Sequence, residues 1–415
     1  METKRHAALS FIFVTVLLDM LAFGIIIPIL PKLISNFLHG DIALSSKYLG
    51  LFVTMWAVMQ FVFAPIIGML SDRYGRRPVI LLSNFGLALD YVIMALAPTI
   101  GWLFLGRLLS GLTSSSVPTA NAYISDVTTP ETRSKAYGIF GAAFGLGFIL
   151  GPAAGGWLGH VNPRLPFWIA AGFSLLNAVY GFFILPESLP AERRQTKLQW
   201  TRANPLGSLK LLRSHHELLG LASVNFLSYL AHEVYVTVFV LYATLRYSWN
   251  ERDVGNSLAL VGITTMIVSA LLVALSVKRF GERTTLFLGL FLGALGFTLF
   301  GASPKAWMFL AAIPVNALWG LASPPLQTLM TQRVSEKEQG ELQGAVASLR
   351  GIAMIVGPGI FSGTFAFFIA PSRNLPGAPW FLSALFLVAG LGLAWAVAPQ
   401  AEAATTDFAA KRVTS

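Results

Sequence analysis

The chain has 415 residues, of which 55% are hydrophobic and only 12% are charged. Soluble domains carry about 25% charged residues, so this composition excludes a water-facing globular surface and indicates an integral membrane protein. The net charge of +10 does not indicate nucleic-acid binding, because the basic residues form short runs between apolar segments. The chain has no cysteine, which excludes disulfides, thiol catalysis and thiolate metal sites.

The apolar segments predict an all-α integral membrane protein. A spanning helix needs roughly 20 mostly apolar residues, and most of these segments lack the polar face of a soluble helix. Basic residues precede the first segment and no small-residue cleavage site follows it, which favours a spanning helix over a removed signal peptide. The twelve predicted spans are 8–30, 49–69, 79–97, 101–123, 134–157, 164–185, 217–245, 254–275, 283–302, 307–329, 340–365 and 377–398.

Lysine and arginine are nearly three times as frequent in one set of alternate loops as in the other. By the positive-inside rule, both termini are predicted to be cytoplasmic. The membrane is expected to be a bacterial-type inner membrane. The longest and most charged loop, 186–216, is predicted to be a cytoplasmic linker between two six-helix bundles. The predicted domains are an N-terminal bundle, 1–185, a C-terminal bundle, 217–398, and a cytoplasmic tail, 399–415.

The two halves of the chain repeat at a constant shift of 206 residues. Arg73-Tyr74-Gly75 corresponds to Arg279-Phe280-Gly281, and Gly151-Pro152 corresponds to Gly357-Pro358. An even six-helix repeat gives both halves the same orientation in the membrane. Transporters built in this way bind substrate near the midplane between the halves and rock one half against the other. We therefore expect a monomeric transporter of a small molecule.

Four motifs resemble those of one transporter family. The segment Gly68–Pro78 resembles the loop signature of the major facilitator superfamily, with Gly68, Asp72, Arg73, Gly75, Arg76 and Arg77 in place. The segments Leu18–Pro31, Arg107–Gly111 and Gly145–Gly156 resemble the first-, fourth- and fifth-helix motifs of its drug/proton antiporter branch. With Asp90 and Gln339–Gly344 included, the chain is most similar to the tetracycline/proton antiporters over nearly its whole length.

The chain departs from those antiporters in its ninth and eleventh predicted helices. Tetracycline exporters carry an aspartate within the ninth helix, whereas Thr285–Phe297 contains no acidic residue. The chain instead has His232 and Glu233 in its seventh helix and Arg350 in its eleventh. These departures argue against tetracycline itself as the substrate.

Ionisable residues within the predicted spans are functional candidates, because each costs at least roughly 2.5–3.5 kcal/mol at the bilayer centre. A carboxylate that exchanges an apolar environment for a neighbouring cation can bind and release a proton. We assign proton coupling to Asp19, to Arg107, which the resemblance places nearest to it, and to Glu233 and His232. The alternatives are a fixed Asp19–Arg107 pair and a fixed Glu233–Arg350 pair, with His232 bonded to a backbone carbonyl.

Polar residues in the spans are candidate substrate contacts. The alternative is that such residues join helices by hydrogen bonds. The ionisable residues do not form a metal site of recognisable spacing. No cofactor is expected, because no ATP-binding loop is present, so an ion gradient or the substrate gradient must supply the energy, with protons preferred. The candidate substrate contacts are Asp90, Gln60, Asn121, Asn225, Asn316, Gln327 and Arg350.

Two groups of residues are predicted to control conformation. The resemblance implies that Arg76 meets Asp126 and that Asp72 faces the positive N-terminal end of the eleventh helix. These contacts would latch the outward-open state at the cytoplasmic surface; the alternative is plain positive-inside charge. Small residues at helical spacing let backbones approach closely, and proline favours a bend. The predicted packing and hinge residues are Gly145, Gly151, Pro152, Gly155, Gly357 and Pro358.

The sequence therefore predicts a proton-coupled efflux antiporter of a lipophilic or drug-like organic compound. One alternative is a proton symporter that takes up a metabolite, which Glu233, His232 and Arg350 keep open. Another is a transporter-like receptor that no longer transports, against which the complete loop signature argues. An enzyme is not expected, because no nucleophile–base pairing or phosphate-binding loop is visible.

Overall fold

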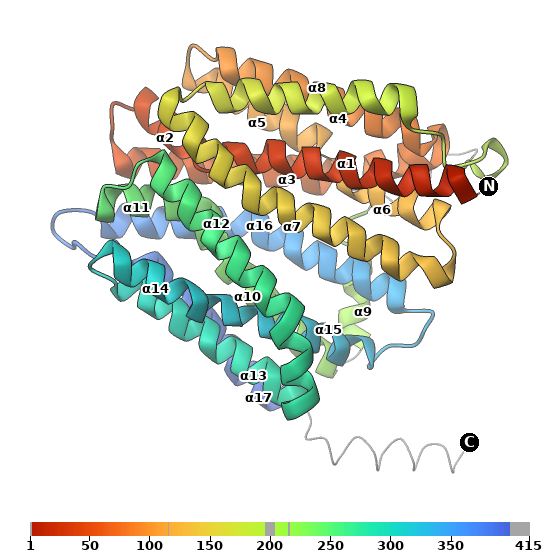
Figure 1. Ribbon diagram of the computed structural model, residues 1–415. Helices are drawn as coiled ribbons and strands as arrows, with labels where there is room; N and C mark the ends of the chain where they lie inside the picture. Colours follow the sequence, from red (N-terminus) through yellow and green to blue (C-terminus); the bar gives the residue numbers. More distant parts are fainter. Residues whose placement is uncertain (1, 115, 196–203, 215, 399–415) are drawn as a thin grey trace, which may run out of the picture. The chain divides into compact units, whose positions relative to one another are not determined.

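A computed structural model describes residues 2–114, 116–195, 204–214 and 216–398, and every regular element within them is helical (Figure 1). Nine helices in this part of the chain are long and apolar enough to cross a membrane, or ten if one bent pair is included. The prediction of an all-α, multi-pass membrane protein is confirmed, whereas the count of twelve spans stays a prediction. The predicted tail, 399–415, and part of the predicted linker lie outside the described residues.

The first half of the sequence forms eight helices (Figure 1). These are α1 (Glu2–Ile26), α2 (Leu30–Phe37), α3 (Ile42–Tyr74), α4 (Arg76–Leu96), α5 (Ile100–Thr113), α6 (Ser116–Val127), α7 (Pro130–Val161) and α8 (Leu165–Ile184). The segment after α8 contains the short 3₁₀ turns η1 (Ala191–Arg193) and η3 (Gly207–Leu209) and the short helix α9 (Lys210–Ser214).

The second half contains α10 (His216–Thr237), α11 (Phe239–Tyr247), α12 (Glu251–Ile267), the π-helical turn η4 (Val268–Leu272), α13 (Val273–Ala302), α14 (Ala306–Ala317), the 3₁₀ turn η5 (Leu318–Leu321), α15 (Ser323–Thr331), α16 (Gln339–Phe368) and α17 (Ala378–Val397).

Several apolar segments are bent or interrupted in the structure. Pro28 and Pro31 separate α1 from α2, since proline cannot donate the backbone hydrogen bond of a helix interior. The pair α10 and α11 bends by 51°. The apolar run Glu251–Ala302 is interrupted at Gly281, whose φ of 76° and ψ of 169° are not helical. Gly281 separates the predicted spans 254–275 and 283–302.

The sequence repeat is also a repeat of local geometry. Gly75 and Gly281, which correspond in the two halves, have φ values of 107° and 76°, a region that glycine enters without steric cost. Two residues after each glycine, an arginine donates to a backbone carbonyl near the end of its half. Arg77 donates to the carbonyl of Phe182 at 2.7 Å, and Arg283 donates to that of Trp395 at 3.5 Å.

The chain divides into two compact units. The first contains α1–α8 together with residues 235–263 and 354–376, and the second contains residues 206–234, 264–353 and the helix α17. In the first unit, α1 packs against α7 and α8, and α4 packs against α5 and α8. In the second unit, α13 packs against α14, η5, α15 and α17. The predicted bundles, 1–185 and 217–398, stay a prediction.

Glycines of α7 bring its backbone against two other helices of the first unit. A Cβ atom on Gly151 would meet the backbone of Gly24 in α1, and one on Gly155 would meet the backbone of Ile25. On another side of α7, a Cβ atom on Gly156 would meet the backbone of α12 at Glu251 and Gly255. Helices of membrane proteins associate through such close contacts, because the hydrophobic effect does not drive helices together in lipid.

The predicted packing glycines are not equivalent. No atom of another described element lies within 4 Å of the place where a Cβ atom on Gly145 would stand. Gly357 and Pro358 are buried in α16, within the first unit. A Cβ atom on Gly50 of α3 would meet Ser362 and the carbonyl of Pro358, so this part of α16 packs closely against α3.

We expect Gly155→Ala to lower stability, because the added methyl group overlaps the Ile25 backbone in α1. Overpacking of this kind costs about 1–3 kcal/mol. Thermal unfolding of the purified protein in detergent measures the effect. Gly145→Ala in the same helix is the control and should unfold at the wild-type temperature. Equal unfolding temperatures for the two variants would contradict this account of the α1–α7 contact.

Candidate functional site

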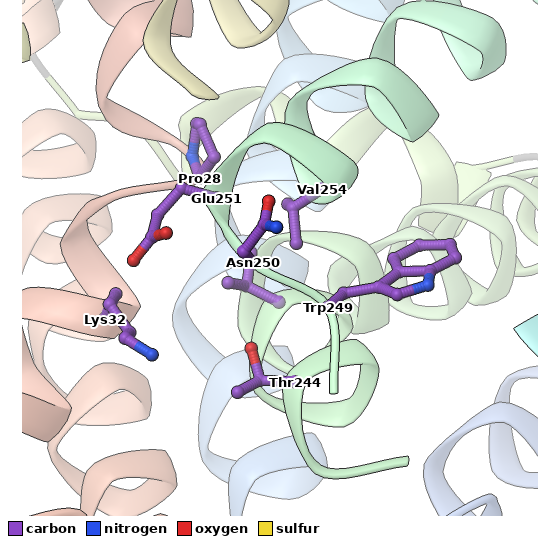
Figure 2. A pocket seen from close by; sticks show the side chains of 8 residues that line it. Pro28, Lys32, Thr244, Trp249, Asn250, Glu251 and Val254 are labelled. Atoms are coloured by element: carbon purple, nitrogen blue, oxygen red, sulfur yellow. The ribbon is translucent and has the colours of Figure 1, made fainter. Parts of the chain in front are cut away.

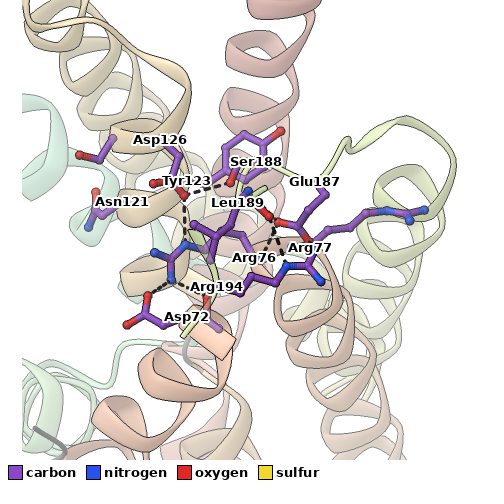
Figure 3. A network of polar contacts seen from close by, with 12 residues as sticks. Asp72, Arg76, Arg77, Asn121, Tyr123, Asp126, Glu187, Ser188, Leu189 and Arg194 are labelled. Atoms are coloured by element: carbon purple, nitrogen blue, oxygen red, sulfur yellow. Dashed lines mark hydrogen bonds and ion pairs between the residues drawn. The ribbon is translucent and has the colours of Figure 1, made fainter. Parts of the chain in front are cut away.

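Arg76, the first residue of α4, is the centre of a polar network at one end of the first unit (Figure 3). Its Nη1 atom donates to Asp72 Oδ1 at 2.5 Å and to Ser71 Oγ at 3.0 Å, and its Nε atom donates to Asp126 Oδ2 at 3.1 Å. The predicted contact between Arg76 and Asp126 is therefore present. Asp126 also accepts from the Ser188 hydroxyl at 3.1 Å. The network joins the ends of α3, α4 and α6 to the segment after α8.

Glu187, which the sequence analysis did not select, caps the start of α4. Its carboxylate accepts from the backbone N–H groups of Arg76 at 2.8 Å and Arg77 at 3.3 Å. The first N–H groups of a helix lack partners within the helix and favour an anion. A Cβ atom on Gly75 would overlap the Glu187 carboxylate, so glycine is needed there for space as well as for its positive φ. Arg194 Nη2 lies 3.8 Å from Oε2 of the same Glu187 carboxylate.

The remaining residues of the loop signature do not join this network. Arg73 lies over the ring of Tyr74 at 5.3 Å and forms no ion pair with any residue that the structure describes. Arg77 bonds to the Phe182 carbonyl, and Gly68 has open space around it. The predicted approach of Asp72 to the start of the eleventh predicted helix stays a prediction.

Within the spans, Arg107 of α5 lies beside Asp90 of α4. Arg107 Nη2 is 3.5 Å from Asp90 Oδ2 and 3.4 Å from Ser110 Oγ. Asp90 is fully buried, and its Oδ1 atom has no hydrogen-bond partner among the described residues. A Cβ atom on Gly106 would meet Asp90 and Met94, so this glycine permits the close approach of α5 to α4. Asp90, predicted to contact substrate, is thus part of a buried ion pair.

Asp19 of α1 accepts a hydrogen bond from an amide of α8. Asn177 Nδ2 donates to Asp19 Oδ1 at 2.9 Å and also to the Thr15 carbonyl at 3.2 Å. The sequence analysis placed Arg107 beside Asp19, but the ion pair that Arg107 forms is with Asp90. The signal for Asn177 was a polar residue in the middle of the apolar segment 164–185.

In the second unit, Arg350 of α16 and His232 of α10 are exposed, whereas Glu233 is buried with 6% of its surface accessible. Arg350 lies over the ring of Tyr229 at 5.9 Å, and the His232 ring lies 6.1 Å from that of Trp319. Arg350 is close enough for its charge to act on both His232 and Glu233. No hydrogen bond or ion pair within 4.0 Å joins Arg350 to a residue that the structure describes, and the alternative of a fixed Glu233–Arg350 pair stays a hypothesis.

The uncharged polar candidates divide into two groups. Gln60 donates to the Ser114 carbonyl at 3.5 Å, and Asn316 donates to the Gly293 carbonyl at 3.4 Å, so both join helices. Asn225 is buried, and Asn121 and Gln327 are half-buried. These positions do not assign a substrate contact.

A further set of contacts joins α7 to the start of α12 in the first unit. The guanidinium carbon of Arg252 lies 3.4 Å from the Trp157 ring centroid, and the Trp157 indole donates to Asn256 at 3.1 Å. In the same region, His160 Nδ1 lies 4.0 Å from Glu251 Oε2. No motif in the sequence marks these residues, because they lie in two helix ends that are adjacent only in the fold.

Next to these contacts is a small pocket at the junction of α2, α11 and α12. Figure 2 shows the Lys32 and Glu251 side chains on its wall, with Thr244, Asn250 and Trp249 around it. Helices from both halves of the sequence therefore meet at this end of the first unit. Further along, Ser46 of α3 donates to the Ser362 carbonyl and Thr54 donates to that of Ile355, both at 3.2 Å.

The sequence profile of the Major Facilitator Superfamily matches residues 12–358. The class C tetracycline resistance protein of Escherichia coli is 36% identical over 386 residues, which cover 93% of this chain and 96% of that protein. The class B protein of Escherichia coli is 32% identical over 404 residues, with 96% and 98% coverage.

Solved structures of similar fold include the human organic anion transporter MFSD10 (TETRAN), at a TM-score of 0.69 and 24% identity over 94% of this chain and 99% of that chain. The nucleoside transporter NupG has a TM-score of 0.77 at 13% identity over 95% and 99%. At these identities the structures show the fold alone. Because the superfamily profile covers most of the sequence and the tetracycline resistance proteins align over nearly all of it, the chain belongs to the major facilitator superfamily, whose members are membrane transporters and not enzymes.

Proposed function

We propose that the chain is a proton-coupled efflux antiporter that exports a lipophilic, drug-like organic compound by alternating access. Both termini lie in the cytoplasm, and the protein acts as a monomer in a cytoplasmic membrane without a cofactor. The similarity to tetracycline resistance proteins supports export of an organic compound. The observation that carries the proton-coupling proposal is the buried pair of Asp90 and Arg107.

The Asp90–Arg107 pair is poorly stabilised in its ionised form. Its N–O distance of 3.5 Å exceeds the roughly 2.7–2.9 Å of a strong charge-assisted hydrogen bond. One carboxylate oxygen has no hydrogen-bond partner among the described residues, and taking two charges out of water is expensive. A proton on Asp90 removes its charge and releases Arg107. Movement of α5 relative to α4 is thereby linked to proton binding.

Asp19 is the second carboxylate of the proposed path. The neutral side-chain amide of Asn177 donates a hydrogen bond to Asp19. An amide N–H can donate to a carboxylate and to a carboxylic acid. The hydrogen bond from Asn177 is therefore kept when Asp19 gains or loses a proton. We assign to Asp19 and Asp90 together the exchange of a proton from outside for substrate from inside.

The Arg76 network is the proposed cytoplasmic latch. Arg76 is mostly buried and binds two carboxylates at once, and Glu187 fixes its backbone at the start of α4. The contacts of Trp157, His160, Glu251 and Arg252 are the proposed outer latch, closed in this structure. Opening toward the outside separates α7 from α12.

A second candidate function is uptake of a metabolite with protons. The observation that favours it is the group formed by Glu233, His232 and Arg350 in the second unit. These three residues are not associated with the tetracycline/proton antiporters, which the chain otherwise resembles.

We expect Asp90→Asn to reduce pH-gradient-driven transport at least tenfold, because the residue can no longer exchange a proton. The substitution also leaves Arg107 buried without a counter-charge, which costs about 3–5 kcal/mol when a buried pair is broken. The double variant Asp90→Asn/Arg107→Gln removes that cost, so it should fold and still lack coupling. Transport of a dye panel in proteoliposomes measures both effects.

Glu192→Gln removes an exposed carboxylate of η1 and serves as the control for that experiment. It should transport at the wild-type rate. A folded double variant that still transports in response to the pH gradient would show that Asp90 does not couple protons.

We expect Arg76→Gln and Arg76→Lys to abolish transport, because neither side chain can bind Asp72 and Asp126 in the planar geometry of a guanidinium. Arg73→Gln, three positions earlier, removes an arginine without an ion pair among the described residues and should retain most activity. Resistance of cells to exported compounds, at matched expression, measures the difference. Equal loss of resistance in the Arg76 and Arg73 variants would indicate that these arginines act only as positive surface charge and that the Arg76 network is not a latch.

The outer latch can be tested by labelling, because the chain contains no cysteine. A Thr244→Cys variant places one thiol in the pocket wall. Loss of the Arg252–Trp157 contact, worth about 0.5–2 kcal/mol as a cation–π interaction, should raise the open population roughly 2- to 30-fold. We expect Trp157→Ala in this background to react faster by that factor with an impermeant maleimide.

Trp168→Ala, which removes an exposed tryptophan of α8, is the control for the labelling experiment. It should leave the rate unchanged. An unchanged rate in Trp157→Ala would mean that this contact does not hold the outer side closed.

A further inference from the structure

Arg350 is a charged residue deep in an apolar helix. It lies eleven residues after Gln339, the first residue of α16, which is about 16 Å along the helix axis at 1.5 Å per residue. The helix is long and apolar enough to span a membrane. Its side chain is nevertheless exposed. A guanidinium that faced lipid at this depth would be strongly unfavourable, so an exposed Arg350 faces water or a ligand.

The hydrogen-bond donors of the Arg350 guanidinium have no acceptor among the described residues. It makes no hydrogen bond or ion pair with any residue in the part of the chain that the structure describes. Its described contact is with the ring of Tyr229, 5.9 Å away. All five of its N–H donors are therefore available to a ligand. Arg107, in contrast, donates to Asp90 and to Ser110.

The surroundings of Arg350 provide apolar and aromatic surface and one buried acidic group, Glu233. Tyr229 and the exposed His232 come from α10, and Trp319 of η5 lies against His232. Glu233 is buried, and it forms no salt bridge with Arg350. A cationic substrate would therefore meet a guanidinium that has no hydrogen-bonded counter-ion among the described residues, whereas an anionic one would supply that counter-ion.

We infer that Arg350 recognises an anionic group of the transported compound, such as a carboxylate, sulfonate or enolate, while the apolar body of that compound packs against Tyr229 and Trp319. A guanidinium binds a planar carboxylate through two parallel hydrogen bonds, which fixes orientation as well as charge. The inference rests on the proposed function and names its substrate class as lipophilic organic anions.

Three probes with the same apolar body and different charges test this inference: 2-naphthoate, 2-naphthalenemethanol and 2-naphthylmethylammonium. Binding to the full-length protein in nanodiscs of zwitterionic lipid is measured by calorimetry. We expect the anion to bind roughly tenfold or more tightly than the alcohol, as one charge-assisted interaction provides, and the cation to bind weakest. Tightest binding by the cation would overturn the inference.

Variants of Arg350 locate the charge preference. Arg350→Gln should bind the anion and the alcohol equally, and Arg350→Lys should keep the preference at reduced affinity, because it keeps the charge but not the planar donors. The matched control is Arg373→Gln, since Arg373 also lies over an aromatic ring, that of Phe367. Arg373→Gln should keep the wild-type preference for the anion over the alcohol. If Arg350→Gln does not fold, the lysine variant decides, and loss of the anion preference in it would contradict the inference.

Two further comparisons separate the possible failures. Abolition of naphthoate binding in nanodiscs rich in phosphatidylglycerol would assign the site to a lipid phosphate and overturn the inference. A protein that transports cations under a pH gradient but binds naphthoate no better than the alcohol keeps the proposed export and loses only the role of Arg350. A protein that binds naphthoate through Arg350 but shows no transport coupled to the pH gradient loses the proposed export alone.

Discussion

The high cost of a charge within a membrane is the constraint on which the proposed mechanism depends. The first unit meets it by pairing: Arg107 lies beside Asp90, and Asp19 accepts from an amide. The Asp90–Arg107 pairing is adequate in one geometry and one protonation state, whereas the Asp19–Asn177 hydrogen bond persists in both protonation states of Asp19. In the proposed mechanism, a proton that arrives or leaves changes which geometry is favourable, and a proton gradient thereby moves helices.

Close backbone packing makes such small changes mechanically effective. The glycines of α7 place its backbone directly against α1 on one side and against the start of α12 on another. Asp19 lies on α1, and the Trp157–Arg252 contact lies between α7 and α12. A shift of α1 that follows a change at Asp19 is therefore passed to α7 without a compressible layer of side chains between them. The local geometry at Gly75, with Arg76 and Glu187 beside it, fixes the other end of the same unit.

The parts predictable from sequence are those that local chemistry dictates. Apolar length predicts spanning helices, and the repeat matches Gly75 with Gly281, which both have positive φ in the structure. The partner of Arg107 was not predictable in the same way. The helices concerned are apolar on nearly all sides, so no amphipathic pattern fixes their rotation or axial offset, and the choice between Asp19 and Asp90 depends on both. Glu187 and Asn177 were missed for a related reason, since each acts across more than 100 residues of sequence.

The central claim is that a pH gradient drives this protein to move an organic compound across a membrane. Purified protein in liposomes, loaded with a panel of lipophilic organic anions and cations, tests it most directly when flux is recorded with and without an imposed pH gradient. The account predicts flux of at least one compound against its concentration gradient, accompanied by proton movement in the opposite direction. Flux that equals that of protein-free liposomes, or that does not change when the pH gradient is collapsed, would contradict it.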